Sequence, residues 1–157
     1  MQTANEETFE KDNYIETGMP AEAGEVFPGK VVEHRDEGFR QVFVCDNFCA
    51  LMVTCVEVGV IRFRFSATGA FAEDFSYAVL PKALEKAFPP EVSQIKNHYA
   101  FKTGELVVLI SRDGLKIRIE DDEGNLLSED EKGFHWRQNE AYGGEVVMMS
   151  RVIQSRE

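Results

Sequence analysis

Residues 60–65 read VIRFRF, and this short stretch decides the fold class. In an extended chain successive side chains point to opposite faces, so Ile61, Phe63 and Phe65 share one face and the two arginines between them share the other. This period of two is typical of a strand with one face in a core and the other near solvent. A helix would place these side chains all around its axis.

Further strands are predicted on both sides of this stretch. Residues 115–120 repeat the alternation, with Leu115, Ile117 and Ile119 inward and charged side chains outward. Residues 49–58 and 106–110 are more continuously apolar, as expected for central strands buried on both faces. Upstream, residues 30–34 and 39–45 are separated by the turn-like cluster 35–38, which predicts a hairpin.

Only residues 81–88 have helical character, because Pro81 suits a first helical position and Pro89 follows directly. At about two turns this helix is too short to organise the fold. No stretch alternates strand and helix as a parallel sheet requires. The sequence therefore predicts an all-β protein, a two-sheet and mostly antiparallel β-sandwich with one short helix; a closed barrel is the alternative.

Composition limits the domain organisation and the partners. The chain has 157 residues, of which 43% are hydrophobic, enough for one domain with a proper core. We expect an acidic, weakly structured leader over residues 1–25 and a single β-sandwich domain over residues 26–157. The formal net charge of −11 disfavours nucleic acid and anionic membranes as partners. No signal peptide or membrane span is recognisable, so we expect a cytoplasmic protein.

The three cysteines match no zinc or redox spacing, because Cys45, Cys49 and Cys55 contain no C-x2-C pair. On a strand Cys49 and Cys55 would share a face with apolar neighbours, so we expect buried, reduced thiols. The three histidines are scattered through the sequence without a family signature for a nucleophilic cysteine.

The acidic residues are interpreted as turn and surface groups rather than as catalytic carboxylates. Residues 73–74 precede a predicted strand, residues 121–123 lie in a predicted hairpin turn, and residues 129–131 are expected to form a solvated cluster. The alternating oxygen ligands of a calcium loop are missing, so no metal site and no cofactor are predicted. The Gly143–Gly144 pair lacks the remainder of a phosphate-binding loop and is expected to form a bend.

The only candidate for sugar contact is Trp136, within the aromatic segment 134–136 and with Tyr142 a little later. An exposed Trp can stack its apolar face on a pyranose ring while its N–H donates a hydrogen bond. Burial in the core or a contact with another domain is the alternative, since Trp is highly buried on average.

Five segments, taken in order, resemble the amino-terminal domain of family 31 glycoside hydrolases. They are RFRFS at 62–66, DFSYAV at 74–79, FKTGEL at 101–106, the hairpin region 115–125 and MMSRVI at 148–153. Their order and spacing carry the resemblance, because each segment alone is unspecific. The resemblance covers residues 27–157 and implies a supersandwich of the galactose-mutarotase-like kind.

The same resemblance implies a supporting role beside an enzyme. In that family the domain packs against a (β/α)8 barrel that cleaves α-linked glucose or a related sugar, and the catalytic acids belong to the barrel. No position here corresponds to them, so we expect no catalytic residue in this chain. The expected role is docking to the barrel and shaping its substrate pocket, with self-association possible through an exposed apolar docking face. The alternative is an independent module that binds an oligosaccharide or a protein.

Overall fold

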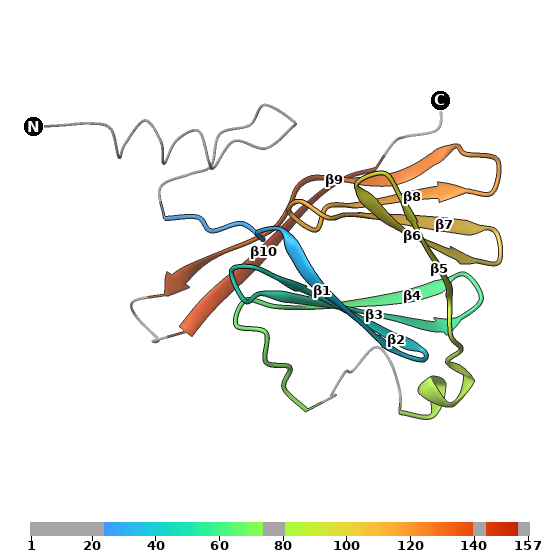
Figure 1. Ribbon diagram of the computed structural model, residues 1–157, viewed down its shortest axis with the longest axis horizontal. Coiled ribbons are helices and arrows are strands. Elements are labelled where there is room, and N and C mark those ends of the chain that lie inside the picture. The colour runs from blue at the N-terminus through green and yellow to red at the C-terminus, as the bar shows by residue number, and fades with distance from the viewer. Residues whose placement is uncertain (1–23, 74–80, 140–143, 154–157) are drawn as a thin grey trace, which may run out of the picture.

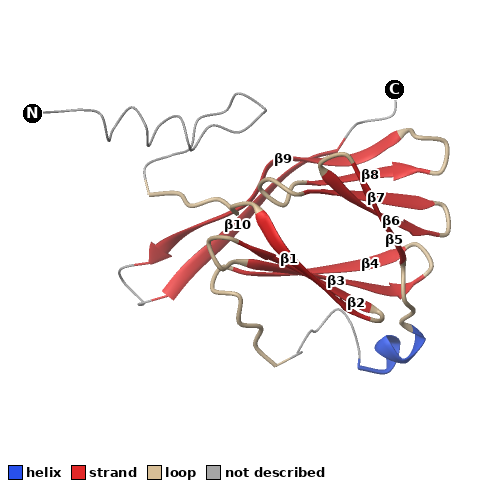
Figure 2. Ribbon diagram, in the orientation of Figure 1, coloured by secondary structure: helices blue, strands red, loops and turns tan. Residues whose placement is uncertain are grey.

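A computed structural model describes residues 24–73, 81–139 and 144–153, and Figure 1 shows two antiparallel sheets packed face to face. Strands dominate the described residues, as Figure 2 makes plain, and the one helix in them is short. The two sheets are separate and do not close on each other. The all-β, antiparallel sandwich expected from the period-two pattern is therefore confirmed, and the closed barrel is not observed.

The smaller sheet is a meander of four strands in chain order. Its strands are β1 (Val31–Glu37), β2 (Arg40–Cys45), β3 (Ala50–Glu57) and β4 (Val60–Ser66). The predicted first hairpin is present, but β1 extends three residues further than expected, to Glu37, and only Gly38 and Phe39 separate it from β2. Strand β3 is buried almost throughout, which confirms its prediction as a central strand.

The larger sheet holds six strands in the order β10-β9-β8-β7-β6-β5. Its strands are β5 (Glu91–Ile95), β6 (His98–Thr103), β7 (Leu106–Ser111), β8 (Ile117–Asp121), β9 (Leu126–Asn139) and β10 (Gly144–Ile153). The pairing of β9 with β10 shifts register between Gly133 and Asp130, so β9 carries a bulge there. Such a bulge bends the strand and increases its twist.

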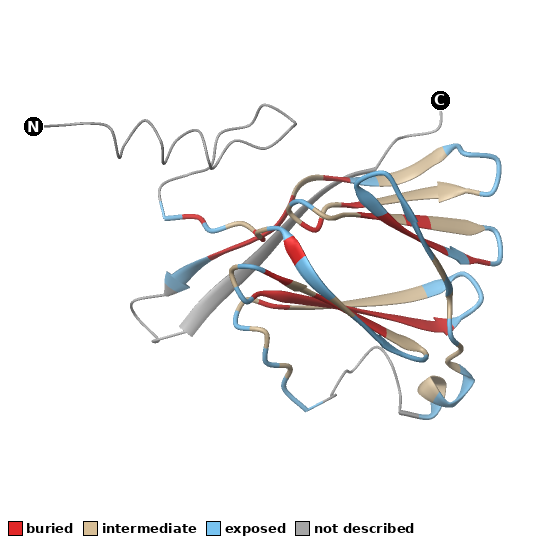
Figure 3. Cartoon of the chain, in the orientation of Figure 1, coloured by how far each residue is buried: buried red, intermediate tan, exposed pale blue. Residues whose placement is uncertain are grey.

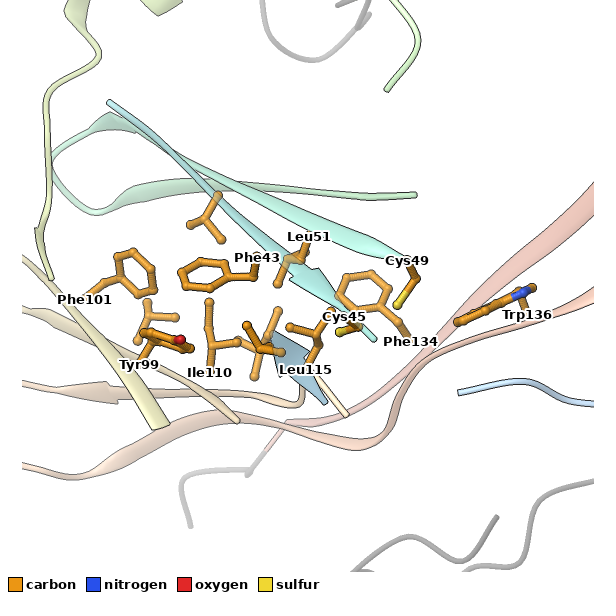
Figure 4. Close-up of a cluster of buried hydrophobic side chains, with 14 residues drawn as sticks. Phe43, Cys45, Cys49, Leu51, Tyr99, Phe101, Ile110, Leu115, Phe134 and Trp136 are labelled. Atoms are coloured by element: carbon orange, nitrogen blue, oxygen red, sulfur yellow. The ribbon is translucent and has the colours of Figure 1, made fainter. Parts of the chain in front are cut away.

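The core fills the space between the sheets. Figure 4 shows Phe43 and Leu51 of the smaller sheet facing Tyr99, Phe101 and Ile110 of the larger one. The predicted inward side chains of β4 and β8 all pack against this cluster. The ring of Phe43 lies 4.7 Å from that of Tyr99 and 5.7 Å from that of Phe101. These aromatic contacts join the two sheets directly, beyond the burial of apolar area.

A second, smaller cluster covers the outer face of the smaller sheet. Val42, Ala50 and Met52 are buried there, and Phe71 packs against them from the segment that follows β4. Arg64 fixes this segment, since its guanidinium donates to the carbonyl of Ala72 at 2.8 Å and lies over the Phe71 ring. This covering explains why β3 is buried on both faces.

The helix prediction needs a correction in type and length. Residues 81–86 form a 3-10 helix, η1 (Pro81–Lys86), which contacts β3. The backbone N–H of Phe88 donates to the carbonyl of Cys55 in β3 and not to a carbonyl of the helix, so the helix ends before this residue. The helix is therefore of the tighter 3-10 type and ends two residues earlier than expected, because Phe88 is bonded to β3.

Two further expectations are wrong in detail. Residues 129–131 were expected to form a solvated acidic cluster, but they lie within β9. Asp130 is only 3% exposed, and it accepts a hydrogen bond from the Ile117 N–H at 2.9 Å.

Strand β7 is central as predicted, but its outward side chains are only half-buried, because the described residues place no second layer over that face. Figure 3 shows this difference between the two sheets.

A strap formed by residues 24–30 joins the two sheets ahead of β1. Val26 pairs with Trp136 of β9 through two backbone hydrogen bonds, and the N–H of Gly29 donates to the Asn47 side chain in the β2–β3 turn. The Asn47 amide in turn donates to the carbonyl of Phe27 at 2.9 Å. Glu25, expected to belong to the leader, is buried; residues 1–23 lie outside the described residues.

Replacing Gly69 with Ala is expected to destabilise the domain by about 2–3 kcal/mol. Gly69 has a φ of +82°, and an added Cβ would lie 2.5 Å from the backbone oxygen of Phe48, which cannot move without disturbing the β2–β3 turn. Gly59→Ala is the matched control, since Gly59 has a φ of +77° but open space around it. Urea denaturation should show the larger loss for Gly69→Ala; equal losses would mean that the backbone contact has no effect.

Candidate functional site

The aromatic segment 134–136 lies inside β9. Trp136 is 6% exposed, and its ring lies 5.5 Å from that of Phe65 in the core. Phe134 stacks on the same phenylalanine at 4.6 Å. Because Trp136 is buried, it offers no open face on which a sugar could stack. Tyr142 lies outside the described residues.

A buried ionic cluster lies beside Trp136, where the strap meets β9. The Glu25 carboxylate is 3.2 Å from the Lys132 ammonium and 3.6 Å from Nε2 of His135. The His135 ring stacks on Phe27 of the strap, and its Nδ1 lies 3.0 Å from the Gly133 carbonyl oxygen. These contacts tie the strap to the larger sheet, so we interpret this cluster as a structural anchor.

The cysteines are free and buried, as predicted. A hydrogen bond with Cys49 and then burial raise the pKa of Cys45, and burial alone raises the pKa of Cys55. Cys49 accepts the hydrogen bond, which lowers its pKa, but its sulfur is fully buried and lies 3.2 Å from the Asn47 side-chain oxygen. A nucleophile must be reachable by its substrate, and these sulfurs are not.

The acidic turn at 121–123 has the structural role predicted for it. The Asp121 carboxylate accepts from the backbone N–H groups of Glu123 and Asn125 at 3.0 and 2.7 Å, and from the Asn125 amide. These bonds fix the β8–β9 hairpin turn. Of the other predicted positions, Asp74 and Gly143 lie outside the described residues.

Neither a metal set nor a membrane helix is found in the part of the chain that the structure describes. There, no three His, Cys, Asp or Glu side chains gather closely enough to hold an ion. None of the helical segments in the same residues has the length and apolar character needed to cross a bilayer.

The large apolar side chains exposed among the described residues are scattered. Phe48 is 75% exposed in the β2–β3 turn, Val58 lies in the β3–β4 turn, and Val60 begins β4. Val26 lies on the strap and Val32 on β1. Ile95 is exposed on β5, in the other sheet. The expected apolar docking face is thus not a single patch of these residues.

A cavity of about 350 Å³ lies at one end of the larger sheet, on the face directed away from the core. Four lining residues share this face, because they alternate along their strands with core side chains. They form two cross-strand pairs, His98 with Ser111 and Arg118 with Glu129. The complete lining is Asn97, His98, Ser111, Lys116, Ile117, Arg118, Glu129 and Asp130. Sequence reasoning placed some of these side chains outward but could not bring them together, because the register that does so is not visible in the sequence.

Comparison with known families agrees with this architecture. Residues 50–157 match the glycosyl hydrolase 31 N-terminal galactose mutarotase-like domain. Because this match covers more than half of the chain, the chain belongs to that domain family. No curated protein matches the sequence significantly.

Two solved enzyme structures share this fold with the chain. The chain is similar to the Flavobacterium johnsoniae dextranase complexed with glucose, at 21% identity and a TM-score of 0.61, over 71% of this chain and 15% of the dextranase. It is also similar to the Listeria monocytogenes cycloalternan-forming enzyme in complex with a pentasaccharide substrate, at 15% identity and a TM-score of 0.56, over 71% of this chain and 10% of that enzyme. At these identities the likeness shows the fold, and the chain spans only a small part of either enzyme.

Proposed function

We propose that this chain is a non-catalytic N-terminal domain of an α-glucosidase-type family 31 glycoside hydrolase. In this role it packs against the catalytic (β/α)8 barrel of the parent enzyme and helps to shape its substrate pocket. The observation that carries the proposal is the family match over residues 50–157. The parent would act on α-linked glucosides. The complexes of the two enzymes above with glucose and with a pentasaccharide support this substrate class.

The arrangement of the acids also supports a non-catalytic role. Glycoside hydrolysis requires two carboxyl groups facing each other across the scissile bond. Among the described residues, the buried carboxylates serve other purposes: Glu25 pairs with Lys132, and Asp130 accepts the Ile117 N–H. The Asp121 carboxylate is used by the β8–β9 turn. None of these three is positioned to protonate a leaving group.

A stand-alone carbohydrate-binding or protein-interaction module is the second candidate function. The cavity on the outer face of the larger sheet favours it, because such a surface is open to a ligand without any barrel. The two candidates differ in what they require: the enzyme domain needs the barrel for its effect, whereas an independent module binds its ligand alone.

The purified 157-residue chain is expected to show no hydrolysis of a chromogenic α-glucoside above the buffer rate. The physical reason is that Glu25, Asp121 and Asp130, the carboxylates discussed above, have structural roles and do not form the facing acid pair that hydrolysis requires. Release of the chromophore should be followed over hours at high protein concentration, with a complete family 31 α-glucosidase as the positive control. Turnover that scales with the concentration of this chain, and survives repurification, would contradict the proposal.

A further inference from the structure

Hydrogen bonds fix several lining residues of the cavity on the outer face of the larger sheet. The Asn97 amide donates to Asp113 at 2.6 Å, and the Ser111 hydroxyl donates to the carbonyl of Asp113 at 2.7 Å. On the opposite wall, Asp130 accepts the N–H of Ile117. The β9 bulge beside Asp130 bends the strand at this point. The cavity is therefore preformed, and a ligand would not have to order its walls on binding.

The charge of the lining disfavours an ionic ligand. Two cationic side chains, Lys116 and Arg118, are balanced by the carboxylates of Glu129 and Asp130. The Arg118 guanidinium is already paired with Glu120 at 2.6 Å and with Glu129 at 3.4 Å. A phosphate would thus meet two carboxylates and a guanidinium that is already neutralised, which makes the site unsuited to anions.

The chemistry of the lining also disfavours an apolar ligand. Ile117 is the one apolar residue of the lining, and its side chain is turned into the core. The remaining lining residues are all polar and carry an amide, an imidazole, a hydroxyl, an ammonium, a guanidinium and carboxylates. Several of these groups also bond within the wall, but as a set they include both donors and acceptors of hydrogen bonds. Adjacent hydroxyl groups, each a donor and an acceptor, match this mixture best.

We infer that this cavity binds a neutral saccharide, one or two sugar rings in size. Ligand sites range from about 300 to 1,000 Å³, and this cavity lies near the lower end. Glu129 and Arg118 keep 48% and 41% of their side chains exposed, so both can reach a ligand from solvent.

The inference can be tested by titrating the isotope-labelled 157-residue chain with isomaltotriose and recording amide chemical shifts. Saturable shifts are expected for residues 97–98, 111, 116–118 and 129–130, with an affinity in the millimolar range. Glu129→Gln should weaken binding roughly tenfold, because it removes a charged acceptor. Glu37→Gln is the matched control, since Glu37 is an exposed glutamate on the other sheet, and it should leave the affinity unchanged.

Each of the other outcomes overturns the inference. Absence of saturable shifts at these amides, or shifts of equal affinity in the wild type and Glu129→Gln, would mean that the cavity is not the site. Inorganic phosphate serves as a second probe, and shifts of the same amides by phosphate but not by isomaltotriose would identify an anion site instead. Ser111→Ala, which removes a wall hydroxyl, provides a second variant if Glu129→Gln does not fold. If isomaltotriose does not bind, the predictions about hydrolysis and barrel docking still stand, so this experiment tests the saccharide site separately from the proposed function.

Discussion

Replacing Phe43 with Ala is expected to lower the free energy of unfolding by about 3–5 kcal/mol. Phe43 is 0% exposed, and its ring contacts His34 and Tyr99 at centroid distances of 4.7 Å each and Phe101 at 5.7 Å. The variant loses this burial and leaves a cavity between the sheets that the surrounding strands cannot fully close. Urea denaturation monitored by Trp136 fluorescence measures the loss.

Phe48→Ala is the matched control for this prediction. It removes the same side chain from a position that is 75% exposed, so the loss should stay within about 0.5 kcal/mol. A loss below about 1 kcal/mol for Phe43→Ala would show that the packing between the sheets is not the main source of stability.

The second large effect is expected at the anchor of the strap. Lys132→Met should destabilise the domain by about 3 kcal/mol, because it leaves the Glu25 carboxylate buried without its ammonium partner. The two groups lie 3.2 Å apart and are 12% and 3% exposed, although they are 107 residues apart in the sequence. Thermal or urea unfolding at neutral pH measures the effect.

A double variant separates the ion pair from the packing of the lysine stem. Glu25→Gln removes the buried charge, so Glu25→Gln combined with Lys132→Met should recover a part of the stability that Lys132→Met loses. If the two substitutions are instead additive, the strap is held by its backbone pairing with Trp136 and by Asn47, and the ion pair contributes little.

The architecture could be predicted from the sequence because alternation fixes the direction of each side chain. Ile61, Phe63 and Phe65 are inward as expected, since a one-residue slip would turn all three to solvent. The continuous apolar run of β3 likewise predicted its central place. The turn at 121–123 was predictable because Asp and Gly have local reasons to be there.

Features that depend on distant parts of the chain could not be predicted. Trp136 reads locally as part of a polar segment, yet Phe65 of the other sheet covers its ring. In the sequence Glu25 resembles the other acidic residues of the predicted leader 1–25, and only its pairing with Lys132 explains its burial. The lining of the cavity is assembled by the register of four strands and by the β9 bulge, neither of which has a local signature.

The role beside an enzyme has a different basis from the fold. The period-two pattern leads to the sandwich alone, whereas membership of the family 31 N-terminal domains rests on the match over residues 50–157. Strands β1 and β2 precede the matched residues, yet they pair with β3 and supply Phe43 to the core. For this reason we propose that variants and truncations should treat the strap and the first hairpin as parts of the domain.

The central claim, that this domain acts by packing against a catalytic barrel, is tested most directly by measuring that association. The 157-residue chain and the separately expressed catalytic barrel of the parent enzyme should be mixed and examined by sedimentation velocity. We expect a stable one-to-one complex with higher α-glucosidase activity than the barrel alone. Two independently sedimenting species, and a barrel whose activity does not change when this chain is added, would contradict the account.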